Sequence, residues 1–263
     1  MHAPAPLSII DPELLLLAYR SGIFPMADAR DDPEVFWIEP RIRAILPLDG
    51  FHLSRSLAKV LRQDRFTVTC NRAFTRVVEE CAMPRADEQG GSWISHRIQA
   101  SYEELHRLGH AHSIECWRSR DDGSLVLAGG LYGVGFDGVF CGESMFSRER
   151  DASKVALAWL VASLRRAGAV LLDCQFQTPH LQSLGAVEIS QRRSLARLKS
   201  ALADYSGASG AGSAGAGSAG AAAAGAGALS LPEGFAALLA EADELGLASS
   251  PGKLIAQSLT QTS

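Results

Sequence analysis

The apolar and polar positions of the first sixty residues predict a helix, a group of short strands and a second helix. Residues 7–22 fit a helix that Asp11 caps and in which Pro12 occupies the first turn. Residues 35–47 place aromatic and aliphatic side chains between prolines, as short strands do. The next helix is expected to begin at Ser54.

The middle of the chain has the pattern of an α+β domain with a mixed sheet. Three closely spaced strands, the last two joined by the hairpin dipeptide Asp137-Gly138, are expected to form an antiparallel meander. The expected elements are a strand over 66–70, helices over 72–82 and 98–108, strands over 112–118, 124–134 and 138–141, an amphipathic helix over 151–167, a strand over 170–175, a helical turn over 180–184 and a helix over 191–203.

A low-complexity segment separates this domain from the end of the chain. Residues 206–228 contain only Ser, Gly and Ala, so they are expected to form a flexible linker. Beyond it, spaced apolar residues predict a short helix, and the last dozen residues are expected to be loose. The predicted division is a small N-terminal α/β domain over 1–50, a catalytic domain over 51–205, the linker over 206–229 and a tail over 230–263.

Composition narrows the class of protein. The 263 residues are 47% hydrophobic, which is ample for a core, but no run approaches the roughly 20 apolar residues of a membrane span. We find no export signal at the start, so the expected location is the cytoplasm. The net charge of −4 argues against a protein that coats nucleic acid indiscriminately.

No pattern of metal ligands is strong. Five cysteines stand singly, without a Cys-x-x-Cys pair. His110 and His112 share one face of a strand, but Glu115 points to the other face, and we expect no metal.

Three groups of polar residues are candidates for chemistry or binding. Glu143 follows a glycine-rich hairpin, which fits either a close approach of a ligand or a glycine-tolerant surface loop. Asp173 and Gln175 project from one face of a strand, as a reactive pair or as a structural hydrogen bond, and Cys174 points away from them. Cations at i, i+4 and i+7 form a basic ridge on one helix face, which binds RNA or is simply solvated; they are Arg55, Lys59 and Arg62.

Several motifs, in order and at similar spacing, resemble those of the leucyl/phenylalanyl-tRNA-protein transferase family. They cover about residues 12 to 203 and stand at 18–25, 109–115, 129–134, 142–148, 152–154, 173–175 and 183–186. The chain departs from the family in its short start, in Met26 where an aromatic residue is common, and in its Ala/Gly linker and tail.

The resemblance implies a small N-terminal domain, a catalytic domain similar to the acetyltransferase (GNAT) fold, and an enzyme that acts as a monomer. Such an enzyme moves Leu or Phe, with Met as a further candidate, from Leu-tRNA or Phe-tRNA to the α-amine of proteins beginning with Lys or Arg. This tags those proteins for N-end rule degradation. The aminoacyl ester is already activated, so no cofactor is expected.

The resemblance also assigns residues. Asp173 and Gln175 correspond to the catalytic pair and Glu143 to the carboxylate that helps hold the acceptor, so we expect that replacing either member of the pair by Ala abolishes transfer and leaves the fold intact. The basic ridge of Arg55, Lys59 and Arg62 corresponds to the cluster that meets the tRNA acceptor stem. The apolar pocket for the amino acid corresponds to Met26, Leu131, Phe140 and Leu160, all of which also fit plain core positions, and the aromatic positions near adenosine are Trp93 and Tyr102.

Two other functions remain open on sequence grounds. An acyl-CoA N-acetyltransferase has a similar fold, but it needs a glycine-containing pyrophosphate turn at the start of a helix, and residues 147–154 contain no glycine. A noncatalytic RNA-binding protein would use the basic ridge and leave Asp173 and Gln175 without a role.

Overall fold

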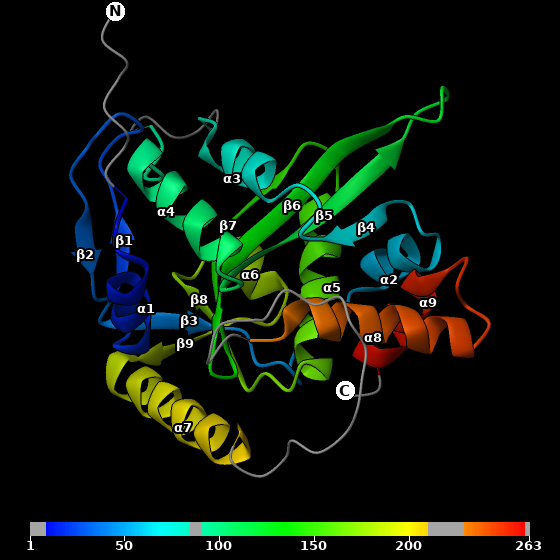
Figure 1. Cartoon of the computed structure of the whole chain (residues 1–263). Coiled ribbons are helices and arrows are strands. Elements are labelled where there is room, and N and C mark those ends of the chain that lie inside the picture. Colours follow the sequence, from blue (N-terminus) through cyan, green and yellow to red (C-terminus); the bar gives the residue numbers. More distant parts are fainter. Residues whose placement is uncertain (1–8, 85–90, 210–228, 261–263) are drawn as a thin grey trace, which may run out of the picture.

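The computed structural model describes residues 9–84, 91–209 and 229–260 (Figure 1). Within these ranges the main sheet has seven strands in the order β4-β5-β6-β7-β8-β3-β9, and a separate two-stranded sheet pairs β1 with β2. The strands are β1 (Phe24–Met26), β2 (Phe36–Ile38), β3 (Ile42–Ile45), β4 (Thr67–Cys70), β5 (Ala111–Ser119), β6 (Leu125–Phe136), β7 (Val139–Ser147), β8 (Leu171–Gln175) and β9 (Val187–Ser190). The expected α+β class with a mixed sheet is confirmed.

Helices cover both faces of the main sheet, and each face has its own apolar core (Figure 1). The helices α1, α3, α4 and α7 contribute to one core, and α2, α5, α8 and α9 contribute to the other. Their bounds are α1 (Pro12–Arg20), α2 (Arg55–Arg62), α3 (Phe74–Ala82), α4 (His96–Arg107), α5 (Ala152–Arg166), α6 (Pro179–Ser183), α7 (Gln191–Ser209), α8 (Leu231–Glu244) and α9 (Pro251–Thr260).

The local signals in the sequence have the expected structural effects. The Asp11 carboxylate accepts hydrogen bonds from two backbone N–H groups at the start of α1, and the Ser54 side chain caps α2 in the same way. Asp137 and Gly138 turn the chain between β6 and β7 with φ values of 44° and 75°. Positive φ at both positions is what a two-residue hairpin turn requires, so the predicted hairpin is confirmed.

Strand β3 joins the main sheet, although the sequence groups it with the short N-terminal strands. It lies between β8 and β9, with Ile45 opposite Asp173 and Ala44 opposite Gln175. Asp173 and Gln175 at the end of β8 therefore lie beside strand β3, which comes from the first fifty residues. The division into domains at residue 50 stays a prediction.

The end of the chain is better packed than its sequence predicts. Helix α9 buries Leu254, Ile255 and Leu259, so the expectation that the last dozen residues are loose is wrong for residues up to 260. Helix α8 packs on α5, where the rings of Phe235 and Trp159 lie 5.3 Å apart. This cover explains why α5 is buried on nearly all sides instead of being amphipathic.

The predicted linker and the search for membrane-spanning helices can be compared with the structure only over the described residues. Residues 206–209 continue α7, and the rest of the predicted linker, residues 210–228, lies outside the described residues. None of the helices in the described ranges combines the length and the apolar character that crossing a bilayer requires.

Candidate active site

A cleft opens where strands β7 and β8 separate. Among the pairings of the described strands, this pair alone is parallel, and it extends only from Val139–Cys141 on β7 to Leu171–Asp173 on β8. Beyond that point the two strands diverge and line a cleft of about 840 Å³. Glu143 on β7 and Gln175 on β8 both line it, and each comes from one of the two strands. The topology thus brings two of the predicted residues to one cavity.

Gln175 is held by its backbone as well as by its side chain. Its φ of 60° is left-handed, which is uncommon for a residue other than glycine and marks a position that its surroundings fix. The backbone N–H donates to Asp173 Oδ1 at 2.8 Å, and the side-chain Nε2 donates to Glu143 Oε1 at 2.8 Å. Within the described chain the carbonyl Oε1 of Gln175 accepts no hydrogen bond, so it is available to a ligand.

Asp173 lies behind Gln175 and not on the cleft wall. Its carboxylate forms an ion pair with Arg43 of β3, at 2.9 Å from Oδ2 to Nη2, and the two residues are 6% and 3% exposed. The Arg43 guanidinium also lies over the Phe24 ring and donates to the carbonyl of Gly22. Burial raises the pKa of the Asp173 carboxyl, and the guanidinium opposes that rise. Asp173 therefore acts on the cleft through the backbone of Gln175.

Glu143 accepts hydrogen bonds from three side chains. The hydroxyl of Tyr19 lies 2.8 Å from Oε1, the hydroxyl of Tyr102 lies 2.9 Å from Oε2, and Gln175 Nε2 completes the set. Burial raises the pKa of this carboxyl to about 7, although all three hydrogen bonds favour its charged form. A carboxyl that titrates near neutral pH in a cleft is a candidate for proton transfer.

The remaining predicted cleft residues divide into two groups. Met26, Trp93, Leu131 and Leu160 line the cleft, together with further apolar side chains from Met145, Leu157 and Leu172. Tyr102 and Phe140 are fully buried away from the cleft wall. Tyr102 therefore has no open ring face for a base and Phe140 packs over Gly133 in the core, so their pocket roles stay predictions that the shape of the cleft does not support.

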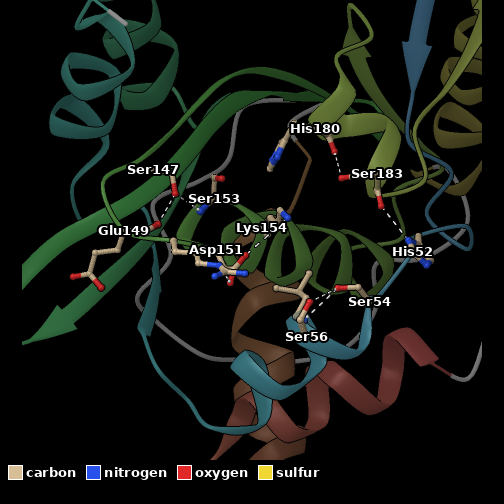
Figure 2. Close-up of polar contacts among 12 residues, drawn as sticks. His52, Ser54, Ser56, Ser147, Glu149, Asp151, Ser153, Lys154, His180 and Ser183 are labelled. Atoms are coloured by element: carbon tan, nitrogen blue, oxygen red, sulfur yellow. Dashed lines mark hydrogen bonds and ion pairs between the residues drawn. The ribbon is translucent and has the colours of Figure 1, made fainter. Parts of the chain in front are cut away.

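The basic ridge lies on an exposed face of α2. Arg55, Lys59 and Arg62 are all exposed, as the helical spacing predicts. Figure 2 shows Lys154, near the start of α5, between the start of α2 and His180 of α6. Since His180 lines the cleft, this side of the molecule leads from α2 to the cleft.

Three residues of the site were not singled out from the sequence. Tyr19 looked like part of the apolar body of α1. Arg43 is a cation within the otherwise apolar strand β3. A charged residue at such a position could have indicated a buried ion pair. Tyr132 lines the cleft, and its buried hydroxyl has no hydrogen-bond partner among the described residues.

Two residues of the weak metal-site pattern have structural partners, whereas His110 Nδ1 and His112 Nε2 are buried without a hydrogen-bond partner among the described residues. Glu115 accepts from the hydroxyl of Ser113, and His112 Nδ1 lies 2.9 Å from the amide nitrogen of Asn71. In the part of the chain that the structure describes, no group of three or more His, Cys, Asp or Glu side chains could hold a metal ion.

Comparison with known proteins identifies the class and the family. The model of the leucyl/phenylalanyl-tRNA protein transferase family matches residues 45–199, and that of the family's N-terminal domain matches residues 9–41. With its mixed sheet and its carboxyl and amide pair in a cleft, the chain is an aminoacyltransferase. It belongs to the leucyl/phenylalanyl-tRNA protein transferase family.

Individual relatives are similar over most of their length. A leucyl/phenylalanyl-tRNA-protein transferase of Novosphingobium aromaticivorans is 63% identical over 97% of this chain and 97% of its own. Proteins of the same description from Rhizorhabdus wittichii and Zymomonas mobilis are 60% and 58% identical, over 77% and 75% of this chain and 79% and 72% of their own.

Proposed function

We propose that the cleft transfers Leu or Phe, with Met as a further candidate, from aminoacyl-tRNA to the N-terminal α-amine of proteins beginning with Lys or Arg. The product would be marked for N-end rule degradation. The observation that carries the proposal is the side chain of Gln175, fixed at 2.8 Å from Glu143 in a cleft of about 840 Å³. The family membership supports the choice of donor and acceptor.

The reaction needs two substrates to meet in the right orientation. The aminoacyl ester is already activated, so attack by a free amine requires positioning and the handling of one proton. Gln175 uses its amide N–H on Glu143 and presents its carbonyl oxygen to the attacking amine. That oxygen accepts a hydrogen bond from the amine and keeps the nitrogen lone pair aimed at the ester carbon.

The apolar part of the cleft suits the side chain of Leu or Phe. Met26, Leu131 and Leu160 line it, and a β-branched Val or Ile would be strained in such a pocket by its shape. The half-buried Trp93 offers its ring to the terminal adenosine, where stacking on a base contributes about 1–3 kcal/mol. The acidic Glu143 suits an acceptor with a cationic first residue.

The basic ridge on α2 supports binding of the tRNA acceptor stem. Contacts between cations and phosphates do not depend on base sequence, so one ridge serves many tRNAs. Lys154 lies between the start of α2 and His180, which lines the cleft (Figure 2). Its Nζ lies 3.9 Å from Asp151, a distance at which a half-exposed ion pair is weak.

Replacing Arg55, Lys59 and Arg62 together by Ala is expected to weaken tRNA binding by about tenfold or more at low salt. The slope of log affinity against log salt should become shallower by about three, because three phosphate contacts are lost. The matched control replaces three exposed arginines of α7, which are Arg192, Arg193 and Arg197. Equal losses in both triple variants, measured by filter binding over a salt series, would mean that general charge and not the ridge binds tRNA.

The function itself is tested by one transfer assay. Purified protein is incubated with radiolabelled Leu-tRNA and a protein beginning with Arg, and the label is followed into acid-insoluble material that resists mild alkaline deacylation. An acceptor with an acetylated N-terminus is the control, since it has no free α-amine. Label on the free acceptor only supports the proposal. Binding of tRNA without transfer favours a noncatalytic RNA-binding protein, and transfer from acetyl-CoA favours an acetyltransferase.

A further inference from the structure

We propose that Glu143 takes up the proton that the acceptor's α-ammonium must lose before attack, and that Tyr19 and Tyr102 hold its carboxyl in a ring of hydrogen bonds that favours the charged, proton-accepting form. The inference rests on the proposed function, because it assigns a step of that reaction. Glu143 touches the reacting amine in the cleft, and the two tyrosines are positioning residues.

The ring consists of three oxygen-to-oxygen contacts. Tyr19 and Tyr102 place their hydroxyl oxygens 2.8 Å apart, and the same hydroxyls lie 2.8 Å and 2.9 Å from the two carboxyl oxygens of Glu143. All three distances are those of O–H···O hydrogen bonds. The tyrosines are 1% and 0% exposed, so their hydroxyls depend on this ring for partners.

The ring lacks one hydrogen when Glu143 is ionised. The two hydroxyls supply two protons for three contacts, so one close pair of oxygens has no hydrogen between them. A third proton on Glu143 completes the cycle: Glu143 donates to Tyr102, Tyr102 donates to Tyr19, and Tyr19 donates back to Glu143. In both states Gln175 Nε2 donates to Oε1. The geometry therefore has a place for one additional proton.

The surroundings of Glu143 place its proton affinity close to that of the acceptor. Burial and the charge of Asp173 raise the pKa of the carboxyl, and the hydrogen bonds lower it, with a result of about 7. An α-ammonium has a pKa of about 8, so proton transfer between the two is nearly balanced at neutral pH. The groups that face Glu143 are Tyr19 of α1, Tyr102 of α4, Tyr132 of β6, and Gln175 and Asp173 of β8, with Arg43 of β3 beside Asp173.

The step balances within the two substrates. An N–H bond of the ammonium breaks, its electron pair stays on nitrogen, and the proton binds Glu143. The neutral amine then forms the C–N bond, and the ester C–O bond breaks with its pair on the ribose oxygen. A second proton from nitrogen neutralises that oxygen, and Glu143 returns the first proton to water after the product leaves. Gln175, whose amide is a very weak base, orients the amine and holds no proton.

The test compares the parent with Tyr102→Phe, which removes one hydroxyl from the ring and keeps the aromatic ring. Losing a hydrogen bond to the charged carboxylate should raise the pKa of Glu143 by about one unit or more. With the same acceptor throughout, the acid limb of kcat/KM should move from near pH 7 in the parent to higher pH in the variant. The rate at about pH 6 should fall about tenfold more than the rate at about pH 9.

A second measurement is independent of activity. In the full chain with 13C-labelled glutamate, the Glu143 carboxyl resonance is assigned by its loss in Glu143→Gln and then titrated. The parent should titrate near pH 7 and Tyr102→Phe higher, whereas Tyr132→Phe, which removes a nearby hydroxyl outside the ring, should titrate like the parent. If Tyr102→Phe does not fold, Tyr19→Phe replaces it.

The outcomes separate the inference from the proposed function. A parent that transfers amino acids while Glu143 titrates near its ordinary value of about 4.3 would overturn the proton ring and leave the function standing. An acid limb that stays in place in both tyrosine variants would do the same. A parent without transfer would overturn the proposed function, and the resonance of Glu143 would still decide whether the ring holds a proton.

Discussion

Replacing Gln175 by Ala is expected to lower kcat/KM for amino acid transfer by about a hundredfold or more, because the variant loses the carbonyl oxygen that aims the amine. The fold should survive. Both residues carry a Cβ, so the left-handed backbone at φ 60° is no more strained in the variant. The rate is measured with Leu-tRNA and an acceptor that begins with Arg, and the fold by circular dichroism and thermal unfolding.

Gln177 provides the matched control for this substitution. It is a glutamine two residues beyond Gln175, the last residue of β8, but it lies outside the cleft and donates to the carbonyl of Ala186. Gln177→Ala should transfer at nearly the parental rate. Equal losses in the two variants would show that the loop after β8, and not the amide of Gln175, determines the rate.

Replacing Asp173 by Ala is expected to lower the free energy of unfolding by about 3–5 kcal/mol, because it leaves the Arg43 guanidinium buried without its counter-ion. The structure thereby changes the sequence-based expectation that this variant keeps the fold intact. Activity should fall as well, since the Asp173 carboxylate accepts from the backbone N–H of Gln175. Urea unfolding followed by fluorescence measures the change in stability.

The control for Asp173 is an ion pair at the surface. Arg166 and Glu241 lie 2.6 Å apart, with side chains 19% and 42% exposed, so Glu241→Ala should cost about 1 kcal/mol or less. The double variant Arg43→Met with Asp173→Leu should recover part of the lost stability, because no uncompensated charge remains. If Asp173→Ala unfolds at the same urea concentration as the parent, the buried pair does not stabilise the fold.

The sequence predicted the local structure well and the long-range structure poorly. The cap at Asp11, the hairpin turn at Asp137 and Gly138 and the helix from Ser54 depend on neighbouring residues, and all are confirmed. Strand β9, which pairs with the distant β3, and helix α9, which packs on α2 and α5, were not predicted, because both depend on contacts with distant parts of the chain. The position of β3 depends on pairing between residues about 130 apart, which no local pattern encodes.

In the candidate site, too, the local arrangement could be predicted and the long-range contacts could not. Alternation placed Asp173 and Gln175 on one face of a strand, and the resemblance supplied their roles. Neither could show that Asp173 stands behind the cleft, because that depends on Arg43 of another strand. Nor could a pattern bring Tyr19 to Tyr102, which are 83 positions apart.

The two C-terminal helices have a consequence for how the molecule would respond to cleavage. Helices α8 and α9 cover α5 and contribute to the same core as α2, although residues 210–228 separate them in sequence from the rest of the described chain. A single cut between these two parts of the chain would leave two fragments, and each would carry an apolar surface that the other covers in the intact protein. The two fragments should stay associated after cleavage until the protein is denatured. Fragments that are produced separately should associate when they are mixed.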